Sequence, residues 1–219
     1  RFDLAIVPAV ISISWGEHTT QTTVYTGQPA KITEPTATLE DGKLFNGEIS
    51  YSYTGTSSGT GLPVNTGTYK VKASVAGSDN YTATESEEMT LTINKADQDA
   101  PAAPSAAEEN IKDNRITLDT IENAEYKRDE GEWQTSPVFT GLDPNHGYTF
   151  YVRLKGDKNH NASPSSEGKP ITTKKTMLDG ATVTVSGSYT YTGAAVVPAA
   201  GNVTVELNGV TIDASQYTI

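Results

Sequence analysis

Gly55-Thr-Ser57-Ser-Gly59 matches G-x-S-x-G, the pattern of a nucleophile elbow. The serine of such an elbow stands on a sharp turn between a strand and a helix, where its hydroxyl can attack a carbonyl group. Both flanks of this stretch are instead rich in Ser, Thr and Gly, which are typical of loops. Because a short motif predicts chemistry only in its structural context, we expect a loop at 55–59 and no catalytic serine.

Two further stretches begin like motifs and then depart from them. Leu62-Pro-Val-Asn-Thr-Gly67 resembles the sortase signal L-P-x-T-G but has one residue too many. Asp157-x-Asn159-x-Asn161 begins like a calcium loop, but Ala162 replaces the glycine and Gly168 stands where the bidentate acid is expected. We expect turns in both places, and a weak ion site stays open for the second.

Lys155-Gly-Asp157 resembles an integrin-type tripeptide. Its glycine aligns with Gly77 of a similar hairpin, which indicates that Gly156 serves the turn.

The residues that most often build active sites are scarce or scattered. His18, His146 and His160 fall in three separate predicted loops, without the H-x-H or H-E-x-x-H spacing of a zinc site. The chain has no cysteine, and we find no phosphate-binding loop and no pair of acids in a predicted cleft. We therefore expect neither an enzyme active site nor a cofactor or metal.

Aromatic side chains are the remaining candidates for ligand binding. Flat rings can stack on sugar rings, although in a small sandwich most aromatic residues pack in the core or in cross-strand pairs. The candidates are Tyr25, Tyr51, Tyr53, Trp133 and Tyr151. Among them we single out Trp133 and Tyr151 as a possible platform for a host protein or glycan.

Composition limits the class of protein. The 219 residues predict one to three domains, and a hydrophobic fraction of 35% suits small sandwiches better than one large globule. A net charge of −11 argues against nucleic acid as a partner, because phosphate binding needs a Lys/Arg patch. No apolar run reaches 18 residues and no signal peptide is present. We expect any export or anchoring signal to lie outside this sequence.

The elements that must position these residues read as β-strands. Apolar and polar residues alternate in many short runs, as in an antiparallel sheet with one face in water. Hairpin signals such as Asp41-Gly42, Asn46-Gly47 and Asn208-Gly209 lie between the runs. The clearest runs are Ile11–Trp15, Ile49–Tyr53, Tyr69–Val75, Met89–Ile93, Tyr148–Leu154 and Val203–Leu207.

Internal repeats divide the chain. Tyr69-x-Val71-x-Ala73-x-Val75-x-Gly77 matches Tyr148-x-Phe150-x-Val152-x-Leu154-x-Gly156 at a constant offset (148 − 69 = 79). Tyr-Thr-Gly at 25–27 recurs at 191–193, after about two module lengths. We predict an immunoglobulin-like sandwich at 1–96 with an N-terminal connector strand, a second sandwich at 97–175, and an incomplete immunoglobulin-like module at 176–219.

The residues of these modules resemble known families. Val24-Tyr-Thr-Gly27, Gly67-Thr-Tyr-Lys-Val71 and Leu91-Thr-Ile-Asn-Lys-Ala96 resemble the MBG family of bacterial immunoglobulin-like repeats. Trp133-Gln134, Ser136–Leu142 and Tyr148–Arg153 resemble the fibronectin type III-like modules of large bacterial surface proteins. Leu142-x-Pro144 before Tyr148 is the pattern of a tyrosine corner, in which the Tyr hydroxyl ties a loop to the start of a strand.

The resemblance implies an all-β, secreted or cell-wall-attached protein of Gram-positive type, in which such repeats act as stalks, spacers or adhesive modules. We favour a non-catalytic spacer. A module that binds host protein or glycan, and an accessory region of a secreted polysaccharide-degrading enzyme, stay open. We also expect the incomplete third module to contact another chain, with Phe2–Val7 as a candidate strand, or to fray.

Overall fold

The computed structural model describes residues 7–216, and its fold is all-β. The described chain forms immunoglobulin-like β-sandwiches and a smaller sheet, and no helix within it is long and apolar enough to cross a membrane. It divides into two compact units, of which the first comprises residues up to Gln98 together with Gly156–Ala162. The second comprises Asp99–Lys155 and the described residues from Ser163.

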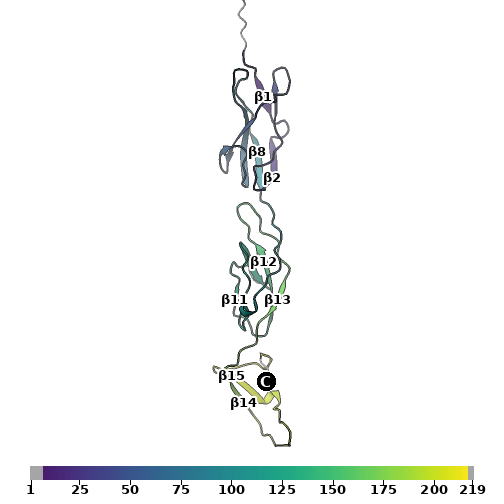
Figure 1. The fold of residues 1–219 in the computed structure, drawn as a ribbon, viewed down its shortest axis with the longest axis vertical. Coiled ribbons are helices and arrows are strands. Elements are labelled where there is room, and N and C mark those ends of the chain that lie inside the picture. Colours follow the sequence, from purple (N-terminus) through teal and green to yellow (C-terminus); the bar gives the residue numbers. More distant parts are fainter. Residues whose placement is uncertain (1–6, 217–219) are drawn as a thin grey trace, which may run out of the picture. The chain divides into compact units, whose positions relative to one another are not determined.

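The first unit holds the strands β1 to β8 (Figure 1). A six-stranded sheet has the path β2-β8-β6-β4-β5, with β7 paired to β6, while β1 and β3 form a separate antiparallel pair. The bounds are β1 Ile11–Ser14, β2 Thr20–Val24, β3 Thr36–Leu39, β4 Ser50–Gly55, β5 Gly59–Thr60, β6 Gly67–Val75, β7 Thr84–Glu85 and β8 Met89–Asn94.

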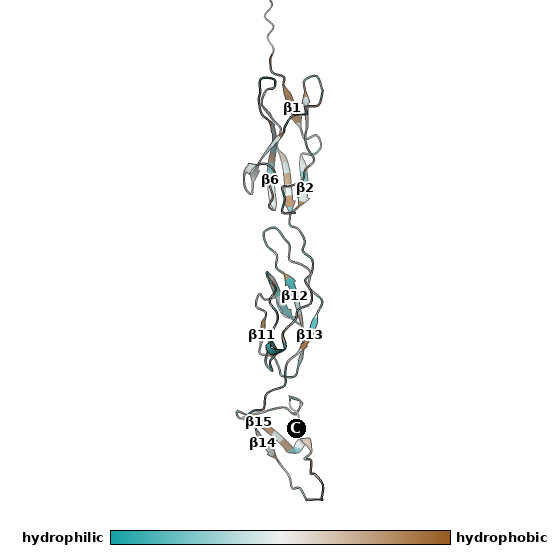
Figure 2. Cartoon of the chain, in the orientation of Figure 1, coloured by the Kyte–Doolittle hydropathy of each residue, from teal (hydrophilic) through white to brown (hydrophobic). Residues whose placement is uncertain are grey.

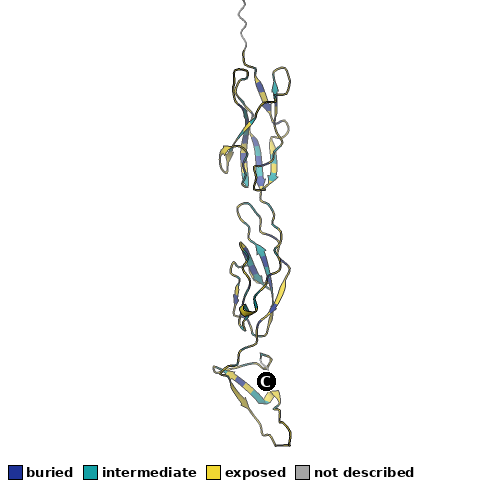
Figure 3. Ribbon diagram, in the orientation of Figure 1, coloured by how far each residue is buried: buried dark blue, intermediate teal, exposed yellow. Residues whose placement is uncertain are grey.

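The core of the first unit lies between these two sheets. Alternate residues of β6 and β8 are buried, because successive side chains of a strand point to opposite faces of the sheet (Figure 3). They pack against apolar residues of β1 and β3 and against Trp15. The buried set is Ile11, Ile13, Trp15, Ala30, Ala37, Tyr69, Val71, Ala73, Val75, Met89, Leu91 and Ile93.

One pairing in the first unit differs from the antiparallel sheet that the alternation predicts. β2 pairs with β8 in parallel, from Thr20 opposite Thr90 to Val24 opposite Asn94. Strand alternation determines which face of a strand is buried but not the direction of its neighbour, so the sequence carries no signal for this pair.

The second unit contains another sandwich. A three-stranded sheet has the order β10-β12-β13, and β9 pairs with β11. The short 3₁₀ turn η1 (Glu108–Asn110) precedes them, and the bounds are β9 Arg115–Thr117, β10 Ala124–Arg128, β11 Val138–Thr140, β12 Gly147–Leu154 and β13 Lys169–Thr172. Its core consists of Ile116, Leu118, Ala124, Tyr126, Phe139, Leu142, Phe150, Val152 and Ile171.

A third sheet follows, of order β14-β15-β16. Its strands are β14 Thr182–Val185, β15 Val203–Leu207 and β16 Val210–Thr211, with the 3₁₀ turns η2 Ala200–Asn202 and η3 Ala214–Gln216. All four residues of β14 are exposed, and β15 buries Val205. These strands carry hydrophobic residues (Figure 2), and Val183, Val185 and Val210 among them are exposed.

The predicted boundaries at 96/97 and 175/176 stay a prediction, although the strands that pair with one another all fall within those ranges. Phe2–Ile6, the main part of the predicted connector strand, lies outside the described residues. The contact of the third module with another chain also stays a prediction.

Candidate functional site

Trp133 and Tyr151 lie near the outward face of β10 and β12. Tyr126 and Val152 point into the core from these strands, so their neighbours in sequence, Lys127 and Tyr151, point outward. Lys127 and Tyr151 stand directly opposite each other in the β10–β12 register. Trp133 reaches this face because Gln134 exchanges two backbone hydrogen bonds with Tyr126, at 2.7 and 2.9 Å.

Cations cover the two rings. The Lys127 Nζ lies 5.4 Å from the ring centroid of Trp133 and 5.0 Å from that of Tyr151. The Arg153 guanidinium carbon lies 4.4 Å from the Trp133 centroid. Each distance is within the range of an attractive cation–π contact.

Glu125 holds Arg153 in place. Its Oε2 accepts hydrogen bonds from Nε and Nη2 of Arg153, at 3.0 and 2.8 Å, and the two residues are opposite each other in the register. The Glu125 and Arg153 side chains are 18% and 31% exposed, so this pair is better shielded from water than a typical surface ion pair. The indole therefore rests on a guanidinium that is itself fixed.

This arrangement limits what the face can bind. Trp133 and Tyr151 are both half-buried, and a sugar ring would have to stack beside Lys127 and Arg153 or displace them. A ligand with a carboxylate or sulfate group fits better, because Lys127 has no acidic partner among the described residues. A shallow hollow of about 320 Å³ is lined by Arg128, Glu132, Gln134 and Val138 among others, but not by Trp133.

The tyrosine corner is confirmed. The hydroxyl of Tyr148, at the start of β12, accepts a hydrogen bond from the Asp143 N–H at 2.8 Å. The guanidinium carbon of Arg128 lies over the Tyr148 ring, 5.1 Å from its centroid. The residue thus fixes the loop before β12 rather than serving as a ligand site.

The serine motif and the sortase-like stretch lie at strand ends. Gly55 ends β4 and Gly59 begins β5, so Ser57 stands in the bend of a hairpin that is followed by a strand and not by a helix. Asn65 and Thr66 directly precede β6. The Tyr69 hydroxyl donates to the Asn65 carbonyl at 2.8 Å, which closes this turn.

In the calcium-like loop, the Asp157 carboxylate binds groups of the loop itself. Asp157 Oδ1 accepts from the N–H groups of Asn159 and His160, both at 2.7 Å, and lies 3.0 Å from the His160 Nδ1. The hydrogen bond from the His160 side chain, followed by that from Asn159, lowers the pKa of Asp157 below its ordinary value. Within residues 7–216, no three His, Cys, Asp or Glu side chains gather as a metal site.

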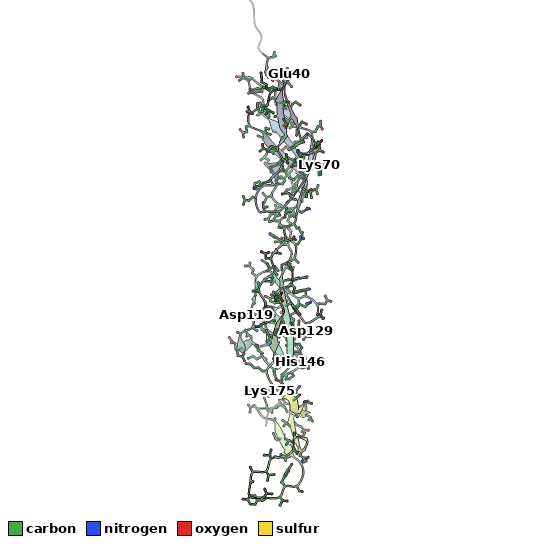
Figure 4. All side chains as sticks on the ribbon, turned by 90° about the vertical axis from the view of Figure 1, so that its right-hand side faces the viewer. Glu40, Lys70, Asp119, Asp129, His146 and Lys175 are labelled. Atoms are coloured by element: carbon green, nitrogen blue, oxygen red, sulfur yellow. The ribbon has the colours of Figure 1, made fainter. Side chains whose placement is uncertain are left out.

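The other two histidines serve local structure. His146 packs its ring against Tyr148, with centroids 4.7 Å apart, and the His18 N–H donates to the Trp15 carbonyl. Charged side chains such as Lys70, Asp119 and Asp129 stand on the outside of the ribbon (Figure 4).

Three serines are buried among residues 7–216, namely Ser86, Ser163 and Ser166, and none was predicted from the sequence. Two of them have equivalent roles in the two sandwiches. Ser86 Oγ accepts from the Ala73 N–H at 3.0 Å, and Ser166 Oγ accepts from the Val152 N–H at 3.1 Å. Ala73 and Val152 are related by the repeat offset of 79 (152 − 73 = 79), so both sandwiches use the same device. The only signal in the sequence is a Ser-Glu pair in the connection that follows each long strand.

No family model matches the chain, and no curated protein matches it. Among solved structures, the chain is similar to the crystal structure of chicken CNTN1 FN1–FN3 domains. The sequence identity is 15%, over 77% of this chain and 69% of that chain, with a TM-score of 0.27. The assignment of immunoglobulin-like sandwiches therefore rests on the strand order and burial described above.

Proposed function

We propose that the chain is a non-catalytic spacer of a secreted or cell-wall-attached bacterial surface protein. The observation that carries this proposal is the parallel pairing of β2 with β8. Because an early strand and the last strand run in the same direction, the chain enters the first sandwich at one end and leaves it at the other (Figure 1). Such a module extends a chain instead of folding it back.

The same pairing resists tension. A load on the two ends of the sandwich pulls β2 from its start and β8 from its end, so the hydrogen bonds between them are strained together and not one by one. The Tyr25 N–H to Asn94 carbonyl bond, at 2.9 Å, lies at one end of the ladder, and the Thr90 N–H to Thr19 carbonyl bond, at 2.8 Å, lies at the other.

Single-molecule pulling tests the proposal, and the absence of native cysteine allows handles at chosen sites. Thr19→Cys with Asn94→Cys pulls the ladder along its length, whereas Thr19→Cys with Glu88→Cys pulls its two strands apart from the same end. All three positions are exposed. We expect a several-fold higher unfolding force for the first pair. Equal forces for the two pairs would remove the mechanical argument for a spacer.

The location belongs to the proposal as well. It is supported by the resemblance of Val24–Ala96 to MBG repeats and by an acidic surface, which keeps extended chains apart. Antibody labelling of intact cells that express the parent protein tests this part, since a signal only after cell lysis would contradict it.

An adhesive module is the second candidate, favoured by the half-buried rings of Trp133 and Tyr151 on one outward face. The full chain is screened against glycan and matrix-protein arrays, with Trp133→Ala as the test variant and Tyr191→Ala, an 86% exposed aromatic residue elsewhere, as the control. A hit that only Trp133→Ala abolishes favours adhesion. Absence of binding by a folded sample favours the spacer or the accessory region of a polysaccharide-degrading enzyme. A catalytic domain in the parent protein would identify the latter.

A further inference from the structure

Two loops of the first unit hold an alanine in the same way. The Ala9 N–H donates to the Asn80 carbonyl at 2.8 Å, and the Thr82 N–H donates to the Ala9 carbonyl at 3.0 Å. The Ala96 N–H donates to the Asn159 carbonyl at 2.9 Å, and the Asn161 N–H donates to the Ala96 carbonyl at 2.9 Å. We call Ser78–Thr82 the first loop and Asp157–Asn161 the second loop.

The two loops have the same internal structure. In the first, Ser78 Oγ accepts from the N–H groups of Asn80 and Tyr81, both at 3.2 Å. In the second, Asp157 Oδ1 accepts from the N–H groups of Asn159 and His160, both at 2.7 Å. A glycine precedes each loop, and a Cβ there would lie 3.2 Å from the Ala83 N or 3.0 Å from the Ala162 N.

The likeness lies in the hydrogen bonds and not in a constant sequence offset. The loops are 79 residues apart (159 − 80 = 79), whereas the two alanines are 87 apart (96 − 9 = 87). The second alanine, Ala96, stands two residues after Asn94, the end of β8, which is the last strand of the first sandwich. Ala9 therefore occupies the position of a residue that leaves a sandwich.

The second loop also contacts the exit end of the first sandwich, which we define as Tyr25, Asn65, Thr66 and Lys95. Asn159 Oδ1 accepts from the Thr66 N–H at 3.1 Å, and Asn159 Nδ2 donates to Asn65 Oδ1 at 3.0 Å. The His160 ring meets the Tyr25 ring edge-on, with centroids 5.2 Å apart. Lys95 Nζ donates to the Asp157 carbonyl at 2.5 Å.

The first loop has no such neighbour. Asn80, the counterpart of Asn159, is exposed, and its carboxamide makes no hydrogen bond within residues 7–216. Tyr81, the counterpart of His160, packs on Phe45 of its own sandwich, with centroids 5.2 Å apart. The unused recognition group of the first loop is thus the Asn80 carboxamide.

We propose that the first loop is a docking surface for the exit end of another β-sandwich, one that presents an Asn-Thr turn to the Asn80 carboxamide. The occupant is defined by the chain itself, because the second loop, built alike, already holds such an end. This inference goes beyond a spacer function, since it names the surface through which a further sandwich joins and does not depend on the location of the protein.

A loop exchange in the full chain tests whether the first-loop sequence can hold the exit end. The substitutions Asp157→Ser, Lys158→Asp, His160→Tyr and Asn161→Thr give the second loop the sequence of the first, with Asn159 retained. The readout is hydrogen exchange of the Thr66 amide, which donates to Asn159. We expect protection close to that of the unmodified chain.

Asn159→Ala is the matched control, because it removes the acceptor and should speed Thr66 exchange by about tenfold. Exchange in the loop-exchanged chain as fast as in Asn159→Ala would overturn the proposal. Loss of protection at both Thr66 and Ala96 would overturn it too, since the first-loop sequence would then fail to hold even the alanine.

A second measurement addresses Asn80 directly. An extra copy of residues 10–96 is joined ahead of Val10 of the full chain, so that its last alanine takes the place of Ala9. The side-chain NH₂ of Asn80 should then exchange more slowly than in the 219-residue chain, and Asp79→Ala, an exposed neighbour, should leave this change intact. Unchanged exchange of the Asn80 side chain would contradict the proposal.

Discussion

The indole Nε1 of Trp15 lies 3.0 Å from Ser86 Oγ, 71 positions further along the chain. The same Oγ accepts the Ala73 N–H at 3.0 Å and donates to the Glu87 carbonyl at 2.8 Å. Ser86 is 5% exposed and Trp15 is 4% exposed. One buried hydroxyl therefore joins the segment after β1 to the last part of β6.

Ser86→Ala should lower the free energy of unfolding of the first sandwich by about 1–3 kcal/mol, because the Ala73 N–H is left buried without its acceptor. Trp15 keeps its second acceptor, the Glu87 carbonyl at 2.9 Å, which limits the loss. Urea unfolding followed by tryptophan fluorescence measures the effect, in a Trp133→Phe background that leaves Trp15 as the one indole. Ser12→Ala, an exposed serine of β1, is the control, and an equal loss in both variants would contradict the role of the buried hydroxyl.

Tyr148→Phe should destabilise the second sandwich by about 1 kcal/mol, because the Asp143 N–H loses its acceptor while the ring is retained. Tyr151→Phe in the same strand is the control, since its hydroxyl makes no hydrogen bond within the described part of the chain. Thermal unfolding of both variants measures the difference. Equal midpoints would show that the corner hydrogen bond contributes no net stability.

Gly55→Ala should be far more costly than Gly61→Ala. Both glycines have positive φ, +130° and +82°, but a Cβ at Gly55 would lie 2.4 Å from the Thr68 carbonyl oxygen, whereas a Cβ at Gly61 meets open space. We expect a further loss of about 1–3 kcal/mol for Gly55→Ala, as for other overpacked sites. Denaturant midpoints of the two variants compare them directly, and similar values would mean that β4 and β6 separate freely at this end.

The Asp157 carboxyl should titrate below its ordinary pKa of 3.8, chiefly because of the His160 side chain. A folded-state pKa below the unfolded value gives stability that is present above the unfolded value and is lost as the pH falls through the folded one. In His160→Phe, the pKa of Asp157 should move back toward 3.8. Carboxyl carbon NMR follows the titration.

Asp213 is the internal control for that titration, because Ser215 and not a histidine lowers its pKa. The Asp213 value should be the same in both chains. An Asp157 pKa that does not respond to His160→Phe would leave the backbone N–H groups as the whole cause.

Much of the fold follows from local patterns in the sequence. The alternation of Tyr69–Val75 and Met89–Ile93 predicts both strands and their buried faces, because a period of two places every second side chain on the core side. Leu142 and Pro144 before Tyr148 likewise predict the corner hydrogen bond, since all three residues lie close together in the sequence, within 142–148.

What the sequence does not predict depends on partners far apart in the chain. The direction of β2 relative to β8 and the burial of Ser86 follow from packing across about 70 residues, which local periodicity does not record. Trp133 was singled out for its flat ring, but Lys127 and Arg153 cover it because the β10–β12 register aligns them. Whether that face binds a ligand stays a prediction.

Pro170 lies in β13, which forms one edge of the β10-β12-β13 sheet. A proline has no N–H to offer to an approaching strand, and the neighbouring Lys169 adds an exposed charge to the same edge. Similar sandwiches held at high local concentration tend to join edge to edge and aggregate. Pro170 and Lys169 therefore hinder the pairing of β13 with a strand of another molecule. Copies of the protein at high local concentration can then stay separate.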